Sequence, residues 1–454
     1  MSLAAIEKEL QHIPLSIWSE PSIQPAASCN QPLSLYNGTG KLSQGSIHYN
    51  FANSEITLDW LPRARLRLTI PDMEGWSFPF KLAPATLKLP ASGSHKVGIT
   101  DYQIPAGTLR ATIYRPAIFG PSNVSNAAYF HLTNFHDLVG APIRSDSHLW
   151  RGRLTLHSSR WIVEIDQRPD LTEAEKDLRA TGGYLVTHAG RIRSASGKAF
   201  GRRDAQSALS NLFFFISFCR GLWSGPVLIR GRTSRGIGWE SWYLPKVKPW
   251  KAISSWFPIL EPKSLQMLSL SFAQFERCLS SRPWQETLSR VIHWYVEANC
   301  DAGGLGGGII LSQSALELLA WTCLTEDPAL RSFSKTRFSK LSAADKIDAL
   351  LRRLGIPAGL PKGFAAAQRA AKNLGVSGSP GCIVQVRNAL VHGEQARRRR
   401  IEDLSFKAQF QVRETALRLV ELCLLRLLDY NGLYYDRSLN GAPEQVSRRV
   451  PWAS

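Results

Sequence analysis

The sequence predicts an α+β multidomain protein, in which a β-rich N-terminal half of antiparallel sheet or sandwich type precedes an all-α helical bundle. The chain has 454 residues, too many for one hydrophobic core of ordinary size. Short segments alternate apolar and polar residues between about 30 and 200, and past Pro258 and Pro262 the apolar spacing becomes helical. We therefore divide the chain into residues 1–258 and 259–454.

Short strands separated by turn residues are expected in the β-rich region. Segments such as SEITLDWLP, ARLRLTIP and RGRLTLHSSRWIVEID place an apolar or β-branched residue at every second position. Residue 200 marks a further change, because a helical pattern and a stretch rich in cations follow it. The region is thus open to division into two subdomains, about 1–200 and 201–258.

Five of the chain's fourteen tryptophans lie between residues 203 and 256, among many Lys and Arg. Aromatic side chains interleaved with cations are able to stack bases and neutralise phosphates. Indoles are also large core fillers, so that buried tryptophans with solvated cations are the favoured interpretation. The five are Trp223, Trp239, Trp242, Trp250 and Trp256.

The helical bundle is predicted from apolar residues that recur three and four positions apart. The expected helices are 264–279, 284–299, 310–324, 343–354, 363–374, 381–392 and about 402–430. The last helix carries one apolar stripe, formed by Phe406, Phe410, Leu417, Val420, Leu424, Leu427 and Leu428. The segment DAGGLGGG (301–308) is predicted to be a flexible connection, and it lacks the ending of a phosphate-binding loop, so no cofactor is expected.

Composition narrows the class of protein. Hydrophobic residues make up 44 % and charged residues 20 %, as in a globular protein. A net charge of +19 points towards polyanions such as nucleic acid. Seven scattered cysteines without a C-x-x-C pair predict reduced thiols in the cytoplasm. The N-terminus does not read as a secretory signal, and the longest apolar run, LFFFISFC, is far shorter than the roughly 20 residues of a membrane span.

The segment VQVRNALVHGE (384–394) carries the candidate chemistry. In a helix Asn388 and His392 share one face, and Arg387 lies beside Asn388. An arginine offers a fork of donors to a phosphate, and a histidine exchanges protons near neutral pH. Asn388 is expected to orient the imidazole or to hold a phosphate oxygen. Gly393 follows, which places His392 near a helix C-terminus, where the helix dipole favours the charged imidazolium. Phosphate binding by the arginine and proton transfer by the histidine require no metal.

Two other features are less specific. Glu317, within ALELLAW, is costly to bury unpaired and is expected to face a cation, with Arg387 as a candidate. A run of four arginines is either a solvated turn or a basic patch that steers RNA phosphates: Arg397, Arg398, Arg399 and Arg400.

His131 and His136 suggest a metal site, for which a structural role is the alternative. The two lie five residues apart beside Asp137, but no further ligand follows at a suitable spacing. A structural role is therefore favoured, and no metal is expected.

With these residues in view, the region from about 264 to 430 resembles HEPN domains, in particular the Apea-like HEPN modules. The matching segments are IHWYVEAN, SQSALELLAW, ADKIDALLRRLGIP and, above all, VRNALVHG. The resemblance implies a metal-independent endoribonuclease, in which Arg387 binds or activates the scissile phosphate of RNA and His392 performs acid–base catalysis, leaving a 2′,3′-cyclic phosphate. It also implies a homodimer, because HEPN domains pair two such motifs in one composite site.

Two hypotheses follow from this resemblance. The first is a regulated cytoplasmic ribonuclease of phage defence or a toxin, whose β-rich half receives a phage-derived or nucleotide trigger. The second is a non-catalytic scaffold, in which the bundle mediates dimerisation or nucleic-acid binding and the motif is structural. RNA cleavage that is lost on substitution of Arg387 or His392 distinguishes the two.

Overall fold

The structure is a computed structural model that describes residues 12–25, 27–71, 83–90, 94–103, 107–113, 117–242, 247–257, 262–395, 399, 404–439 and 446–453. The chain forms two compact units. The sheet unit holds residues 1–155, 160–213 and 224–250, and the helical unit holds residues 156–159, 214–223 and 251–454. The first is mostly antiparallel sheet and the second mostly helix, so the predicted α+β architecture is confirmed.

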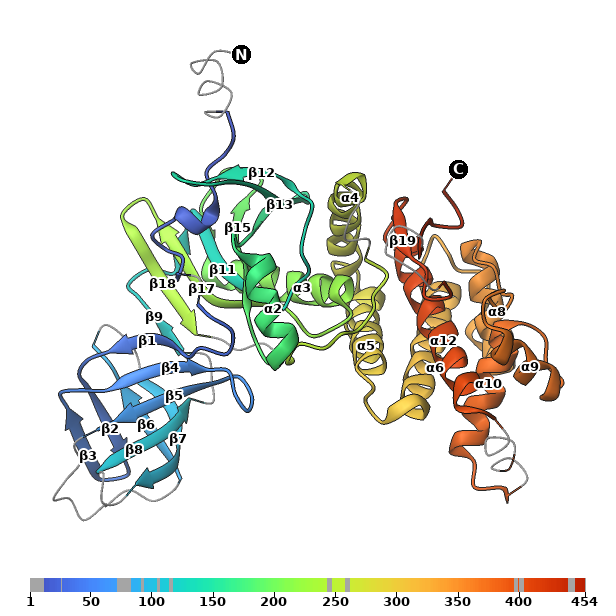
Figure 1. Ribbon diagram of the computed structural model, residues 1–454, viewed down its shortest axis with the longest axis horizontal. Coiled ribbons are helices and arrows are strands. Elements are labelled where there is room, and N and C mark those ends of the chain that lie inside the picture. The colour runs from blue at the N-terminus through green and yellow to red at the C-terminus, as the bar shows by residue number, and fades with distance from the viewer. Residues whose placement is uncertain are drawn as a thin grey trace. The chain divides into compact units, whose positions relative to one another are not determined.

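Eight strands of the sheet unit form one antiparallel sheet in the order β1-β4-β5-β8-β7-β6-β2-β3. They are β1 (Leu33–Asn37), β2 (Gly40–Gln44), β3 (Ile47–Phe51), β4 (Glu55–Asp59), β5 (Arg65–Ile70), β6 (Pro84–Lys88), β7 (Ser94–Gln103) and β8 (Thr108–Ile113). Figure 1 shows them in blue and cyan as a strongly twisted layer. In β5, Leu66, Leu68 and Ile70 are buried and the residues between them half-buried, which is the alternation expected from the sequence.

A second eight-stranded sheet has the order β12-β13-β14-β15-β11-β17-β18-β9. Its strands are β9 (Ala117–Phe119), β11 (Ala127–Thr133), β12 (Ala141–Arg144), β13 (Leu149–His157), β14 (Trp161–Gln167), β15 (Val186–Ser194), β17 (Pro226–Thr233) and β18 (Gly236–Trp242). β11 lies between β15 and β17, and all of its residues are buried, as expected for a central strand.

Smaller elements complete the sheet unit. They are the 3₁₀ turn η1 (Ile17–Ser19), the strand pair β10 (Val124–Ser125) and β16 (Phe200–Gly201), and helix α2 (Leu171–Thr181). α2 packs Leu171 and Leu178 against Leu185. Helix α3 (Arg202–Arg220) contains the apolar run LFFFISFC and passes from the sheet unit into the helical unit.

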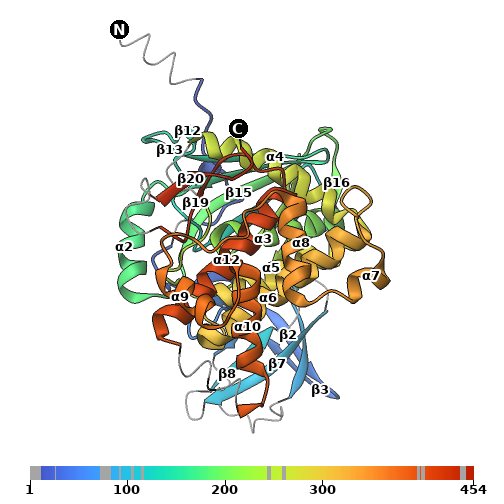
Figure 2. The same cartoon turned by 90° about the vertical axis from the view of Figure 1, so that its right-hand side faces the viewer.

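The helical unit is built around α6, which contacts α5, α8, α10 and α12. Figure 2 shows these helices gathered in one bundle. The elements are α4 (Pro262–Leu279), α5 (Arg282–Asn299), α6 (Gly304–Trp321), the π-helical turn η2 (Thr322–Glu326), α7 (Lys335–Ser339), α8 (Ala343–Leu354), α9 (Ala365–Asn373), α10 (Gly378–Val391), α12 (Phe406–Leu427), β19 (Leu433–Tyr435) and β20 (Ser447–Arg449).

The glycine-rich segment before α6 is not the flexible connection that the sequence predicts. Gly303 caps α6 with a left-handed backbone, φ 75°, and the helix begins at Gly304. A Cβ atom on Gly306 would lie 3.3 Å from Leu390, and one on Gly308 would lie 2.8 Å from Nε of Arg413. The prediction was wrong because these glycines serve close helix packing, which a run of glycines in sequence does not reveal.

The tryptophan-rich stretch supports the structural interpretation. Trp223, Trp239, Trp242 and Trp256 are all buried, and Trp250 is half-buried. The cations around them are less solvated than expected. Within the sheet unit, for example, Arg232 forms a 2.6 Å ion pair with Glu20.

One helical segment, Gly304–Glu326, is long and apolar enough to cross a membrane, but 61 % of its apolar window is buried, as in the core helix of a soluble protein.

The seven cysteines are free thiols, as expected, and five of them are buried. Burial raises the pKa of the Cys278 thiol to about 11 and that of Cys382 to about 12, so both are protonated at neutral pH.

Candidate active site at the end of helix α10

Helix α10 places the three motif residues at its C-terminal end. Its buried side chains, Cys382, Ile383, Val384, Val386 and Ala389 among them, pack into the bundle. Arg387 and Asn388 are half-buried, whereas His392 is exposed. His392 is the C-cap: its backbone turns extended, φ −90° and ψ 134°, while its N–H still donates to the carbonyl of Asn388 at 3.0 Å. The predicted position of His392 at a helix C-terminus is thus confirmed.

Arg387 has an incomplete set of partners. Its Nη1 donates to Oδ1 of Asn388 at 3.3 Å, and its Nε is buried without a hydrogen bond to any residue that the structure describes. A buried donor without a partner costs about 1–3 kcal/mol. Asn388 therefore contacts the arginine rather than the imidazole that the sequence suggested.

Other arginines of the bundle differ sharply from Arg387. Arg418 binds Asp436 at 2.9 Å and the hydroxyl of Tyr434 at 3.0 Å, and Arg437 binds Glu414 at 3.0 Å and Glu421 at 2.8 Å. These guanidiniums are held by carboxylates, as structural arginines are. Arg387 has no ion pair with any described residue, so its charge remains free to meet an anion.

Glu317 does not pair with Arg387 in the described part of the chain. Its Oε1 accepts a hydrogen bond at 2.8 Å from Nε2 of Gln313, one turn earlier on α6. The side chain is half-buried, and no cation among the described residues lies within ion-pairing distance of it. Glu317 therefore has a local partner on its own helix.

The arginine run is only partly visible. Arg397, Arg398 and Arg400 lie outside the described residues, while Arg399 is exposed. A contact between this run and a ligand thus remains an expectation for three of its four members.

Three apolar side chains at the end of α10 and the start of α12 are exposed, which sequence reasoning did not predict. Val391 ends α10 with 42 % of its surface exposed, and Phe406 and Phe410 begin α12 with 75 % and 43 % exposed. Later members of the predicted stripe, such as Leu417 and Val420, are buried. The apolar periodicity predicts one stripe along α12, but it does not indicate that the stripe residues of the first turns are exposed and only the later ones lie in the core.

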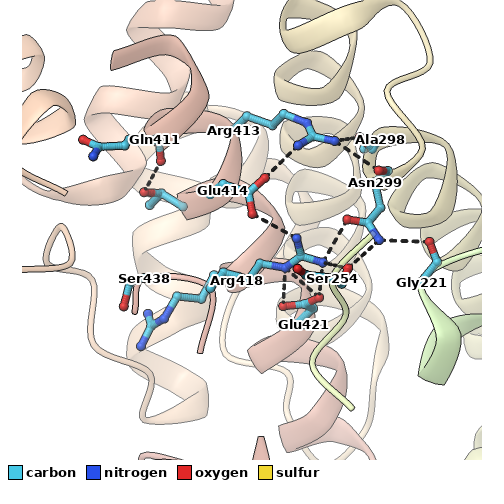
Figure 3. Close-up of polar contacts among 12 residues, drawn as sticks. Gly221, Ser254, Ala298, Asn299, Gln411, Arg413, Glu414, Arg418, Glu421 and Ser438 are labelled. Carbon is cyan, nitrogen blue, oxygen red and sulfur yellow. Dashed lines mark hydrogen bonds and ion pairs between the residues drawn. The ribbon is translucent and has the colours of Figure 1, made fainter. Parts of the chain in front are cut away.

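α12 carries a buried network of ion pairs that the sequence did not suggest. Figure 3 shows Arg413, Glu414 and Glu421 converging with Asn299. Arg413 binds Glu414 at 2.7 Å, and Tyr295 donates to Glu421 at 2.6 Å.

Arg437 joins this network from beyond α12. Burial lowers its pKa, but Glu421 and Glu414 raise it more, so the pKa lies well above its usual value. Paired on both sides, the guanidinium stays charged, and the network has a structural role.

Of the two histidines considered for a metal, His131 has a buried, structural environment. His131 is buried in β11, and its Nε2 lies 3.3 Å from the carbonyl of Gln24. No cluster of three potential metal ligands occurs among the residues that the structure describes.

Comparison with known proteins matches two regions of the chain to described domains. Residues 120–253 match the YopA central domain, and residues 281–447 match the YopA C-terminal domain. The second match contains the whole α10 motif. Neither match is to a HEPN domain, so the HEPN resemblance stays a prediction. No solved structure matches the chain.

A relative extends the similarity to nearly the full length. The chain is 24 % identical over 440 residues to the SPbeta prophage-derived uncharacterized protein YopA of Bacillus subtilis (strain 168), covering 93 % of this chain and 95 % of that protein. The chain is thus similar to a prophage-derived protein and to two YopA domains.

Proposed function

We propose that the helical unit is a metal-independent endoribonuclease of the HEPN kind, with Arg387, Asn388 and His392 at its active site. One observation carries the proposal. Arg387 keeps a single 3.3 Å hydrogen bond to Asn388 one turn before an exposed His392, whereas Arg413, Arg418 and Arg437 are bound by carboxylates. A half-buried, uncommitted guanidinium beside an accessible imidazole suits a phosphodiester substrate.

The reaction transfers the phosphoryl group within the RNA. The 2′-oxygen attacks the adjacent phosphorus and loses its proton to a neutral imidazole, while the bond from phosphorus to the 5′-oxygen breaks. An imidazolium gives a proton to that leaving oxygen. Arg387 stabilises the charge on the phosphoryl oxygens. The products are a 2′,3′-cyclic phosphate and a 5′-hydroxyl, and no metal or redox partner takes part.

A homodimer would supply both proton-transfer groups. Each chain has one His392 in this setting, so His392 and the partner's His392 would serve as base and acid. The exposed Val391 ends α10, which carries the motif, and the exposed Phe406 and Phe410 begin α12; they would offer apolar surface for pairing. The arginine run 397–400 would then contribute positive charge beside the RNA.

The proposed setting is the cytoplasm, and the proposed role is phage defence or toxicity. The similar Bacillus protein is prophage-derived by its name, which agrees with a role connected to phage. The sheet unit would hold the nuclease inactive until a phage-derived molecule or a nucleotide reaches it.

A non-catalytic scaffold is the second candidate, in which the bundle mediates dimerisation or binds nucleic acid. It is favoured by the lack of any described residue that hydrogen-bonds the His392 imidazole, since catalytic histidines are commonly oriented by a second group. Under this hypothesis RNA is bound and not cut.

The test is expression with and without phage infection, followed by sequencing of RNA ends. The wild type is expected to arrest growth and leave 2′,3′-cyclic phosphate ends, whereas Arg387→Ala and His392→Ala do neither. Arg369→Ala changes an exposed arginine of α9 and serves as the matched control, expected to behave as wild type.

Purified protein is expected to cut RNA in EDTA, provided that the activating condition is met. Intact RNA in all four proteins under infection would reject the nuclease and leave the scaffold. An absolute requirement for Mg²⁺ would point to different chemistry.

A further inference from the structure

The helical unit contains a cleft of about 820 Å³ between the first turns of α5 and the end of α6. Its walls come from α5, η2 and α7. The Arg387 motif lies near the other end of α6, because Leu390 approaches Gly306. Trp321 ends α6 fifteen positions later, roughly 22 Å away at 1.5 Å per residue. The cleft is therefore a separate site.

Positive charge dominates the cleft. Arg282, Arg290 and Arg331 line it, are exposed, and have no side-chain hydrogen bond or ion pair with described residues. The fourth cation, Lys335, binds Glu326 at 3.1 Å. Three uncommitted guanidiniums around one hollow form an arrangement that binds multiply charged anions, since arginine recognises phosphate in a bidentate manner.

The loop that carries Arg331 is fixed. Trp284 donates its indole N–H to Asp327 at 2.6 Å, and the other oxygen of Asp327 accepts from the backbone of Ala329 and Leu330 at 2.8 and 2.9 Å. Arg353 donates to the carbonyls of the same two residues at 2.9 and 3.0 Å. Arg331 follows directly, so its backbone is held beside the cleft.

The floor of the cleft has an unusual backbone. η2 is a π-helical turn, a rare form that often occurs at functional sites, and its Thr322, Thr325 and Glu326 line the cleft. Thr322 shares a 2.8 Å hydrogen bond with Thr287 of α5, which joins the two walls. The N-terminus of α5 points the positive end of its dipole here, and Ser281 does not cap it with its side chain.

We propose that this cleft binds a nucleotide that carries two or more phosphates. The arginines and the α5 N-terminus would hold the phosphates, and Trp321 with Leu318 would contact the base. The exposed side chain of Glu286, which has no hydrogen bond or ion pair with a described residue, would accept hydrogen bonds from sugar hydroxyls.

Size and charge distribution favour a small ligand over an RNA chain. The volume falls within the roughly 300–1,000 Å³ of small-molecule sites. Two carboxylates, Glu286 and Glu326, lie on the same walls and would repel an extended polyanion. The inference does not depend on the proposed nuclease.

Isothermal titration calorimetry of the full chain with ATP, tripolyphosphate and adenosine measures the affinity of the site for each ligand. ATP is expected to bind, tripolyphosphate to bind more weakly, and adenosine not to bind. Arg290→Gln and Arg331→Gln should each weaken ATP binding by about tenfold or more, as expected for loss of a charged hydrogen bond. Trp321→Leu should weaken ATP and leave tripolyphosphate unchanged.

Two matched variants serve as controls. Arg369→Gln removes an exposed arginine outside the cleft that has no ion pair with a described residue, and His392→Ala removes the motif histidine; both should bind ATP as the wild type does. Unchanged melting temperatures would show that the cleft variants are folded. Lack of binding by ATP, or ATP binding that Arg290→Gln and Arg331→Gln leave intact, would overturn the proposal. Binding of single-stranded RNA that requires these arginines and is not displaced by ATP would also overturn the proposal.

Discussion

Arg437 donates from Nε to both carboxylate oxygens of Glu421 at 2.9 Å, and the two side chains are only 2 % and 0 % exposed. The same guanidinium binds Glu414 and the carbonyl of Ser254. A fully buried cation with two acidic partners is tolerated only while all of them are present, because each charge has lost its hydration.

Arg437→Met is therefore expected to destabilise the helical unit by about 3–5 kcal/mol, since it leaves Glu421 and Glu414 without their shared cation. Urea unfolding followed by far-UV circular dichroism measures the change. The control Arg369→Met alters an exposed arginine and should change stability by less than about 0.5 kcal/mol. Equal effects of the two variants would contradict a structural role for the network.

Stability of the sheet unit should fall between pH 6.5 and about pH 4 because of two buried histidines. Burial lowers the pKa of His131 to about 4 and that of His188 to about 3, from an ordinary value of 6.5. Below pH 6.5 the unfolded chain takes up protons that the folded chain refuses, so stability decreases as pH falls. Each histidine contributes up to about 1.4 kcal/mol per pH unit.

The variant His188→Leu is expected to roughly halve that contribution between pH 6 and pH 5 in unfolding experiments. His148→Leu, at an exposed position, serves as the control substitution. A pH profile that His188→Leu does not alter would show that His188 is protonated in the folded protein.

Gly308→Ala is expected to destabilise the bundle by about 1–2 kcal/mol, although alanine favours helices. The added Cβ would lie 2.8 Å from Nε of Arg413. Arg413 has little room to move, because it binds Glu414 at 2.7 Å and Asp301 at 2.6 Å. Gly359→Ala places its Cβ in open space, and thermal melting should find it close to wild type.

Phe406→Glu combined with Phe410→Glu is expected to produce a monomer if the proposed dimer uses the exposed start of α12. The change places charge on an apolar surface whose side chains are 75 % and 43 % exposed. Sedimentation equilibrium gives the mass. Leu270→Glu on α4 alters a similarly exposed residue, 60 %, and should stay dimeric. A wild type that is monomeric at all concentrations would reject the dimer.

Local signals in the sequence were enough to predict most helices. The predicted range 343–354 matches α8, since Ser342 caps it by accepting from the N–H of Asp345 at 3.2 Å and Gly355 ends it with a left-handed backbone. Alternation likewise predicted strands such as β5, because one face of that strand lies in a core and the other does not. The Arg387–His392 spacing indicated the candidate site for a similar local reason, because Arg387 lies in the last turns of α10 and His392 is the C-cap of the same helix.

Features that join distant parts of the chain escaped prediction. Glu421 of α12 and Arg437, in the turn after β19, lie 16 positions apart, and Ser254, whose carbonyl Arg437 also binds, lies 183 positions from Arg437. The cleft gathers Arg290 and Arg331 from separate segments. Such groups depend on how helices pack, which periodicity does not encode.

The position of Arg437 after α12 also bears on proteolysis. Arg437 follows α12 in the chain, and its side chain pairs with Glu421 and donates a hydrogen bond to the carbonyl of Ser254. A protease cut between Tyr430 and Asp436 that releases the C-terminal peptide would leave the buried carboxylates of Glu414 and Glu421 without the cation that pairs with them. Such nicking is expected to loosen α12 as a whole, so the segment after α12 stabilises the helix that carries Glu414 and Glu421.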